Sequence, residues 1–358
     1  MGLFSLKPDP IVGIDISSTA VKMIELSRSG SEYTVESYGI DFLSEKAVED
    51  KTVAQPESVG SVIQRVLKKA KPKAQHVAVA VSGPAVITKV TTMDKGLSDS
   101  DIMAELEGGN YVGTPIEEVK MDFEVIGDSE KEPERIDILL AAARNENVDA
   151  VTEAIELGGL IPAVVDIEKY ALENAFILLV QNDPEIDEEE AVALVEVGAT
   201  TITINVLRKL KNVYSREDMF GGNRLTEDIQ ARYELSYEEA TLAKRNTNLP
   251  EGYEAELLEP FREEVAQQIS RMVQYYYAGE AAAKHGKLSH ILIAGGCVSI
   301  KGVIDEVSKK VGGRISIANP FIKMNLSKKV DKDSLYQDAP ALMVACGLAL
   351  RNFDHEAH

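Results

Sequence analysis

Two short stretches, half a chain apart, hold residue types that suit phosphate and magnesium chemistry. Each has a strand rich in β-branched residues that ends in one acid, then a turn of small and hydroxyl residues, then a second strand. The stretches cover residues 12–26 and 193–207, and their acids, Asp15 and Glu196, occupy equivalent positions 181 residues apart. A pattern of this kind, repeated at half the chain length, predicts a nucleotide clamp.

The chemistry of each stretch follows from the size and charge of its side chains. Small turn residues let backbone N–H groups and hydroxyls approach phosphate oxygens closely. A carboxylate at the strand end suits Mg²⁺, usually through water, because this ion prefers oxygen ligands and sheds its water reluctantly. Either stretch alone is equally consistent with an ordinary hairpin, but repetition with the acid in register favours two facing hairpins around one Mg-triphosphate.

Two glycine motifs in the second half extend this pattern. Residues 220–229 place two glycines before an amphipathic helix, and residues 291–302 run from a buried strand through a glycine turn into a helix. Glycines at strand-to-helix junctions allow a ribose, base or phosphate to approach the backbone and the helix N-terminus. A single glycine pair is more often a tight turn, but in this order the two motifs predict a pocket for base and sugar.

Composition limits the classes of partner. The chain has 358 residues, enough for two or more domains, and a net charge of −21, which argues against nucleic acid or an anionic membrane surface as the main partner. No apolar run is long enough to span a membrane. Cys297 and Cys346 lie among small apolar residues. Buried thiols in a reducing cytoplasm are the simplest interpretation.

The remaining periodicity predicts a mixed α/β protein with an insertion. A strand at 33–40, a helix at 58–69 and a buried strand at 76–81 form the first half of a mixed domain. The pattern of expected elements changes at residues 85–156. This segment predicts a small α+β insertion, with a helix that starts near Ser98 and two strands. A helix at 263–283 carries three consecutive tyrosines, 275–277, which we interpret as a packing face.

The order of these motifs resembles the actin-like ATPases. Within that superfamily the sequence motifs at 14–19, 220–222 and 319–321 are similar to those of the PilM family of type IV pilus assembly proteins. This family is related to the division protein FtsA. The resemblance covers nearly all residues from about 10 to 353. The matching phosphate 1, connect 1, phosphate 2, sugar, adenosine and connect 2 segments are residues 13–19, 165–168, 196–200, 220–222, 294–296 and 339–347.

The resemblance implies an actin-like fold in two lobes with a small insertion of the SHS2-like 1C type. The implied subdomains are 1A (9–84, 160–190 and 338–353), 1C (85–159), 2A (191–224 and 286–337) and 2B (225–285). It also implies ATP or ADP with Mg²⁺ as cofactors, and turnover that is slow at most. The implied partners are the cytoplasmic N-terminal tail of a PilN-like membrane protein, bound beside 1A and 1C, other pilus assembly proteins and possible self-association, all at the cytoplasmic face of the inner membrane.

The resemblance also assigns site residues. Lys22 is the expected counter-charge to a phosphate, Asp15 and Glu196 are the expected Mg²⁺ residues, and a solvated helix lysine is the alternative for Lys244 and Lys301. The implied nucleotide-binding residues are Gly13, Asp15, Ser17, Ser18, Thr19 and Lys22 in phosphate 1, Gly198, Ala199, Thr200 and Thr201 in phosphate 2, Gly221, Gly222, Asn223 and Thr226 in the sugar segment, Glu239 and Lys244 on the next helix, and Gly295, Gly296, Ser299 and Lys301 in the adenosine segment.

Two departures and one open role accompany these assignments. Relatives have Asp where this chain has Glu196, whose extra methylene moves the carboxylate. Glycines at 108–109 predict that the insertion helix ends near Glu107. Glu168 and Asp166 are the candidates for orienting water against a terminal phosphate, and helix capping is the alternative for either.

A small-molecule kinase and an FtsA-like division filament protein are the alternative functions.

Overall fold

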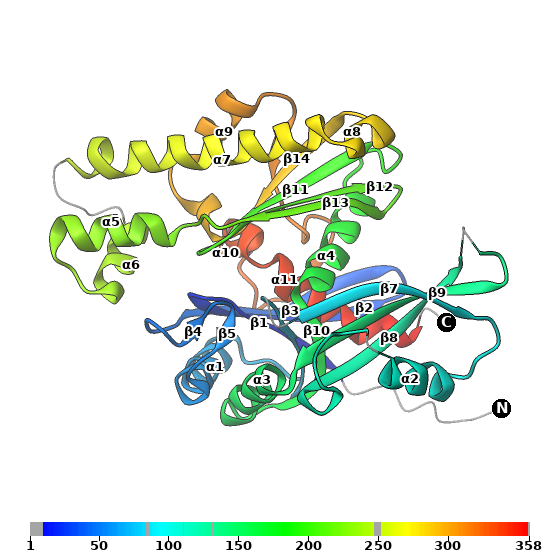
Figure 1. Cartoon of the computed structure of the whole chain (residues 1–358). Coiled ribbons are helices and arrows are strands. Elements are labelled where there is room, and N and C mark those ends of the chain that lie inside the picture. The colour runs from blue at the N-terminus through cyan, green and yellow to red at the C-terminus, as the bar shows by residue number, and fades with distance from the viewer. Residues whose placement is uncertain (1–9, 84–85, 110, 130–131, 247–251, 357–358) are drawn as a thin grey trace.

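The structure is a computed structural model that describes residues 10–83, 86–109, 111–129, 132–246 and 252–356. Two mixed β-sheets dominate it (Figure 1), with strand orders β10-β6-β1-β2-β3-β16 and β13-β12-β11-β14-β15. We call the parts built on these sheets the first lobe and the second lobe. The strands are β1 (Ile11–Ile16), β2 (Ala20–Ser29), β3 (Glu32–Phe42), β6 (His76–Val81), β10 (Ile161–Ile167) and β16 (Asn325–Leu326) in the first sheet, and β11 (Ala191–Val197), β12 (Ile202–Arg208), β13 (Lys211–Asp218), β14 (Leu288–Ala294) and β15 (Ile315–Ile317) in the second.

Both sheets follow the same plan. β1 pairs antiparallel with β2 and parallel with β6, and β11 pairs antiparallel with β12 and parallel with β14. Asp15 lies opposite Lys22 across the first hairpin, and Glu196 lies opposite Thr203 across the second. The two acids therefore occupy the same register position, which confirms that the repeated stretches are structural equivalents.

Helices separate and cover the two sheets. α4 and α11 lie between the sheets, where their apolar residues share one core with β2 of the first lobe and β11 and β14 of the second. α1 and α3 cover the outer face of the first sheet; α1 begins with Pro56 in its first turn and buries Val59, Val62 and Val66. These helices are α1 (Pro56–Ala70), α3 (Asn145–Leu157), α4 (Glu168–Asn182) and α11 (Met343–Leu350), and a small hairpin of β4 (Val48–Glu49) and β5 (Thr52–Val53) precedes α1.

The outer face of the second sheet is covered by helices that pack over its own apolar core. The predicted helix at 263–283 is two helices, because the chain turns at Gly279. Tyr276 is fully buried, but Tyr275 and Tyr277 are exposed, so the predicted packing face is limited to one tyrosine. The elements are α5 (Asn223–Tyr233), α6 (Tyr237–Asn246), a π-helical turn (Glu254–Leu258), α7 (Glu259–Ala278), α8 (Glu280–His285), α9 (Val303–Val311) and α10 (Lys332–Asp338), with 3-10 turns at Gly296–Ser299, Ala339–Ala341 and Arg351–Glu356.

A three-stranded sheet in the order β7-β9-β8 projects from the first lobe as the predicted insertion. Ser98 caps α2 and its side chain accepts from the Asp101 N–H, and the helix ends at Gly108, close to the predicted end. α3 packs into the first-lobe core and also contacts the insert, where Lys120 on β8 pairs with Asp149 on α3, so the predicted bounds of the insertion stay a prediction. Its elements are β7 (Val86–Asp94), α2 (Asp99–Gly108), a 3-10 turn (Ile116–Glu118), β8 (Val119–Asp128) and β9 (Arg135–Arg144).

The architecture is the predicted α/β fold: two lobes of the same sheet plan, with a small α+β unit added to the first. Within the described ranges, no helix has the length and apolar character needed to cross a bilayer.

Candidate functional site

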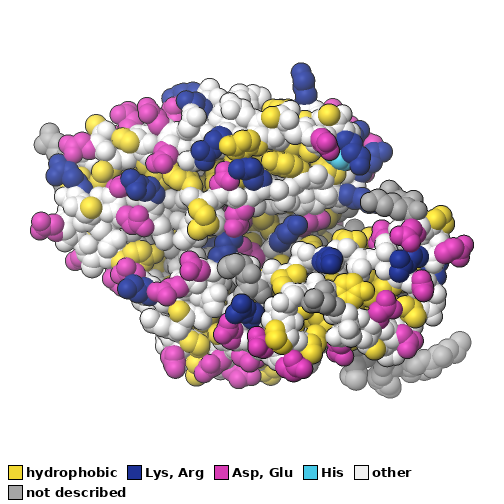
Figure 2. All heavy atoms as spheres, in the orientation of Figure 1, with side chains coloured by type: hydrophobic (Ala, Val, Ile, Leu, Met, Phe, Trp, Pro, Cys, Tyr) yellow, Lys and Arg dark blue, Asp and Glu magenta, His cyan; other side chains and the backbone are white. Residues whose placement is uncertain are grey.

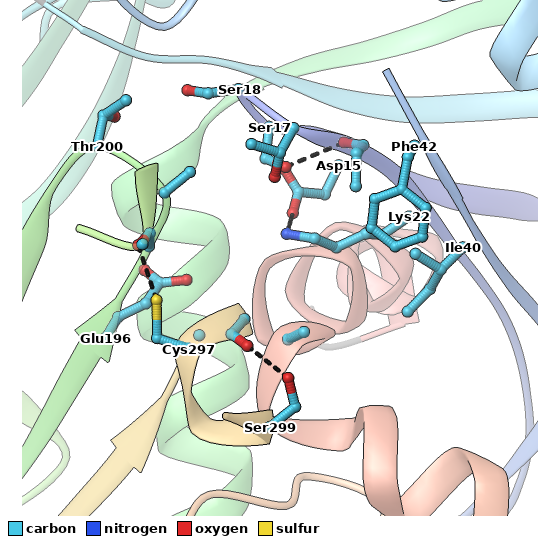
Figure 3. Close-up of a pocket in the computed structure, with 18 of the residues that line it drawn as sticks. Asp15, Ser17, Ser18, Lys22, Ile40, Phe42, Glu196, Thr200, Cys297 and Ser299 are labelled. Carbon is cyan, nitrogen blue, oxygen red and sulfur yellow. Dashed lines mark hydrogen bonds and ion pairs between the residues drawn. The ribbon is translucent and has the colours of Figure 1, made fainter. Parts of the chain in front are cut away.

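The two predicted hairpin turns lie on opposite sides of one cavity of about 420 Å³ between the lobes. Both turns have the same backbone geometry: the Ser17 N–H donates to the Ala20 carbonyl at 3.0 Å, and the Gly198 N–H donates to the Thr201 carbonyl at 2.9 Å. In Figure 3, Ser18 and Thr200 mark the two sides of the opening. The tertiary structure thus brings together two turns that are half a chain apart, and we call this space the interlobe cavity.

Most of the predicted site residues line the interlobe cavity. The exceptions are Gly13, Asp166, Gly221, Asn223, Thr226 and Glu239, which do not contribute to its lining. The predicted residues that do are Asp15, Ser17, Ser18, Thr19 and Lys22 from the first hairpin, Glu168, Glu196, Gly198, Ala199, Thr200 and Thr201 from connect 1 and the second hairpin, and Gly222, Lys244, Gly295, Gly296, Ser299 and Lys301 from the sugar turn, α6 and the adenosine segment.

Two of the predicted glycines serve close backbone packing. A Cβ on Gly13 would lie 2.2 Å from the Ala345 carbonyl oxygen, so this glycine lets β1 lie against α11. A Cβ on Gly295 would lie 2.3 Å from the Val197 carbonyl oxygen, and its φ of +93° is left-handed. By contrast, a Cβ on Gly296 would meet nothing within 4 Å, so the open space at this segment lies at Gly296.

A buried ion pair lies at the base of the first hairpin. Lys22 Nζ is 2.7 Å from Asp15 Oδ2, and Figure 3 shows the two side chains pointing toward each other inside the cavity. Burial lowers the pKa of the Lys22 ammonium, but the charge and hydrogen bond of Asp15, with smaller contributions from Glu196 and Glu168, outweigh burial and raise this pKa overall. The lysine is therefore a permanent cation in the cavity wall.

Two further carboxylates meet beside that pair from opposite lobes. Burial, followed by the charges of Glu168 and Asp15, raises the pKa of Glu196 to about 7, although Lys22 and Lys51 oppose the shift. Burial also raises the pKa of Glu168, against Lys51, which stands 3.6 Å from it. The cavity therefore concentrates negative charge that a cation would relieve.

These carboxylates fit Mg²⁺ only as a water-mediated site. Among the described residues, no group of three or more histidine, cysteine or carboxylate side chains converges as a direct metal cage. Mg²⁺ characteristically keeps several waters and takes one or two carboxylates plus phosphate oxygens. Asp15 on one lobe and Glu196 on the other can supply such contacts through water, and burial is the main cause of the raised pKa of Glu196.

Hydrogen bonds join the sugar segment, residues 220–222, to α6, and not every predicted side chain here points into the cavity. Lys244 Nζ donates to the Gly222 carbonyl at 3.1 Å and to Thr226 Oγ1 at 2.7 Å, so Thr226 anchors a cavity lysine. Glu239 Oε2 instead accepts from the Ser236 N–H and hydroxyl, both at 2.9 Å. Glu239 thus stabilises the start of α6 and does not line the cavity, and its contact with a nucleotide stays a prediction.

The two candidates for orienting water have opposite surroundings. Asp166 Oδ1 accepts from the Ile167 N–H at 2.7 Å and Oδ2 lies 3.4 Å from Arg351 Nε, outside the cavity. Glu168, two residues later, lines the cavity. Ile167 is the N-cap residue of α4, so the bond from its N–H to Asp166 fits the helix-capping alternative for Asp166. Only Glu168 is placed where it could act on a bound phosphate.

The structure adds cavity residues that sequence reasoning missed. Most come from segments outside the predicted motifs, for example the β4–β5 hairpin and α10, which no local pattern marked. Tyr237 and Thr241 lie on the same helix as Lys244, at helical spacing, and that spacing was a usable signal. The main additional residues are Ile40, Phe42, Lys51, Ser82, Tyr237, Thr241, Gln337 and Asp338.

Cys297 also lines the cavity, where its thiol donates to the Gly198 carbonyl at 3.3 Å. Burial raises the pKa of this thiol to about 11, so it stays protonated. Both cysteines are buried and free, as predicted.

Two lobes of one sheet plan, with paired hairpin turns facing a shared cavity, define the actin-like ATPase fold. Residues 13–353 match the family model described as type IV pilus assembly protein PilM, so the chain belongs to that family. This membership places the protein in type IV pilus assembly and favours that prediction over the kinase and division-filament alternatives.

Solved structures agree with the fold. A PilM–PilN type IV pilus biogenesis complex contains a chain with a TM-score of 0.77 and 23% identity, with 97% of this chain and 99% of that chain covered. The ethanolamine utilization protein EutJ from Carboxydothermus hydrogenoformans is more distant, with a TM-score of 0.55, 16% identity and coverage of 97% and 91%. At these identities the likeness establishes the fold.

Proposed function

We propose that this protein is an ATP-binding scaffold of the type IV pilus inner-membrane complex, with Mg-ATP in the interlobe cavity. The observation that carries the proposal is the pair of equivalent turns, at Ser17–Ala20 and Gly198–Thr201, on opposite walls of one charged cavity. Serine and threonine hydroxyls and backbone N–H groups in such turns suit phosphate oxygens. Their presence on both lobes means that one bound triphosphate would contact both halves of the molecule.

Each charged residue of the cavity would have a separate role around the phosphates. Lys22 supplies a permanent positive charge beside the first turn. Asp15 and Glu196 would hold Mg²⁺ through its waters, and the ion would neutralise phosphate charge. Glu168 is the residue that would orient an attacking water, because it alone of the two candidates lines the cavity. We expect turnover that is slow at most, with the nucleotide acting mainly as a conformational ligand.

The same proposal includes the cytoplasmic N-terminal tail of a PilN-like membrane protein as partner. A structural relative is a chain of a PilM–PilN type IV pilus biogenesis complex, and this chain belongs to the PilM family. The insert offers two open sheet edges, β7 and β8, beside the first lobe. An extended peptide can bind such an edge through backbone hydrogen bonds and side-chain pockets. Binding of this tail would hold the protein at the cytoplasmic face of the inner membrane.

The nucleotide part is tested by identifying what the protein carries. Protein purified without added ligand is denatured, and the released small molecules are separated on a column; ATP is also titrated with and without Mg²⁺. Bound ATP or ADP with Mg²⁺-dependent affinity is the expected result. A protein that carries nothing and binds no ATP would refute the nucleotide site.

The partner part needs a separate measurement. A fluorescent peptide with the N-terminal sequence of a PilN protein is titrated with this protein, and a scrambled peptide serves as control. Saturable binding of the native sequence alone is expected; equal binding of both peptides would contradict the proposal.

A further inference from the structure

Lys51 is held in place by the β4–β5 hairpin of the first lobe. It is one of the two central residues of that hairpin's tight turn, and both Asp50 (φ 47°) and Lys51 (φ 62°) are left-handed, as a two-residue hairpin loop with a type I′ turn requires. Val48 and Val53 on either side are buried in the first-lobe core. The turn is therefore a rigid platform that projects one lysine toward the second lobe.

The Lys51 side chain crosses from one lobe to the other. Its Nζ lies 2.8 Å from Glu217 Oε2 on β13 of the second lobe and 3.6 Å from Glu168 Oε1 on α4 of the first. The lysine side chain is 18% exposed, whereas Glu217 is 46% exposed. Thr203 also donates to Glu217 Oε2, at 3.4 Å, which orients the carboxylate on the second lobe. The ammonium thus links two lobes that the interlobe cavity separates.

Lys51 also stands in the wall between two hollows. One is the interlobe cavity, and the other is a groove of about 680 Å³ between the second lobe and the base of the insert, which we call the second groove. On the face drawn in Figure 2, acidic, basic and apolar side chains are interspersed along the boundary of the lobes. The residues common to both linings are Lys51, Ser82, Glu168, Glu196, Thr200 and Thr201.

We propose that Lys51 binds the terminal phosphate of the nucleotide and, through Glu217, couples that contact to closure of the two lobes. An ammonium has three donors, and the two carboxylates leave capacity for a phosphate oxygen. Lys22, beside the first turn, is also paired, but its partner Asp15 at 2.7 Å lies on the same lobe, so that pair does not link the lobes. Lys51 is thus a cation that can add a phosphate without leaving its partner on the opposite lobe. This inference rests on the proposed nucleotide binding.

The test measures lobe closure and nucleotide affinity separately. Spin labels are attached to Glu146→Cys on α3 and Lys309→Cys on α9, and the distance distribution between the lobes is recorded without nucleotide, with ADP and with ATP; both native cysteines are buried. The variants are Lys51→Met and Glu217→Gln. Lys120→Met is the matched control, because it removes a 2.7 Å ion pair to Asp149 away from the cavity.

The expected pattern is specific to the coupling. ATP narrows the distribution of distances between the two spin labels in the wild type and in Lys120→Met. Neither ATP nor ADP narrows this distribution in Lys51→Met. Lys51→Met weakens ATP binding about tenfold or more, as expected for a lost hydrogen bond between charged groups, and ADP binding less. Glu217→Gln broadens the nucleotide-free distribution and weakens ATP binding only about two- to fivefold, because its pair with Lys51 is partly exposed.

Two results would overturn the inference. If Lys51→Met keeps the ATP-to-ADP preference of the wild type, the lysine does not contact the terminal phosphate. If Lys51→Met and Glu217→Gln leave the nucleotide-free distribution unchanged, the pair does not hold the lobes. Wild-type protein that binds no nucleotide would refute the proposed nucleotide site itself, and the nucleotide-free distributions alone would then decide whether the lobes are linked at this pair.

Discussion

Replacement of Glu196 by glutamine should change how the stability of the nucleotide-free protein depends on pH. Burial in the cavity, followed by the charges of Glu168 and Asp15, raises the pKa of Glu196 from 4.5 to about 7. Between these values the folded protein keeps a proton that the unfolded chain releases. Stability therefore falls as the pH rises through this window, because the unfolded state binds fewer protons. Glu196→Gln keeps the side-chain shape and removes this titration.

The size of the effect follows from the shift. Each pKa unit corresponds to about 1.4 kcal/mol. With the two pKa values above, the wild type should lose about 2 to 3 kcal/mol of unfolding free energy relative to Glu196→Gln from about pH 5 to about pH 8. Most of that loss should fall between about pH 5 and about pH 7, where the folded and unfolded proton counts differ most.

Urea denaturation followed by far-ultraviolet circular dichroism measures this difference, since the chain has no tryptophan. Wild type, Glu196→Gln and Glu146→Gln are compared in nucleotide-free buffer; Glu146 pairs with Arg144 on the surface of α3 and controls for loss of a carboxylate. The free-energy curves of wild type and Glu196→Gln should diverge with rising pH while Glu146→Gln follows the wild type. Parallel curves for all three proteins would refute a buried, charge-crowded Glu196.

Three further outcomes are expected. Asp15→Ala should abolish Mg²⁺-dependent nucleotide retention, and an unchanged ATP titration by calorimetry would contradict its role. Gly295→Ala should lower the unfolding free energy by about 2 kcal/mol or more, because its φ is left-handed and its Cβ would meet a β11 carbonyl; Gly296→Ala, with open space, should stay near wild type in thermal melts. Glu168→Gln should lower any phosphate release from ATP, whereas Asp166→Asn should not; equal losses would mean that neither residue orients water.

The hairpin turns were predictable because their chemistry is local. A turn of small and hydroxyl residues and the acid at the strand end lie within about ten residues of sequence, and the same pattern recurs 181 residues later. A continuous apolar run likewise predicted β6, and a helical stripe of apolar residues predicted α1. Local backbone preference and hydrophobic periodicity decide such elements before any tertiary contact forms.

The placement of other predicted residues depends on chain direction and packing, which no local pattern specifies. Asp166 and Glu168 are two residues apart at a strand-to-helix junction, and only the start of α4 at Glu168 decides which carboxylate lines the cavity. Gly13 matches the phosphate 1 segment and Gly295 the adenosine segment, and a Cβ at either position would meet backbone of α11 or β11. A glycine motif indicates that a side chain does not fit at that position. It does not indicate whether a ligand or the protein's own backbone occupies the space.

The sequence by itself determined that this α/β chain of the PilM family has two equivalent hairpins of the phosphate-binding kind. Each of these features depends on residues that are contiguous in the sequence. The tertiary structure confirmed that the hairpins face each other, and it alone decided that Glu196 is crowded by Glu168 and that Lys51 bridges to Glu217. Lys51 and Glu217 are 166 residues apart, and no local rule relates them. The physical reason is that the charge and burial of a cleft arise from packing between lobes, whereas a turn is set by its own few residues.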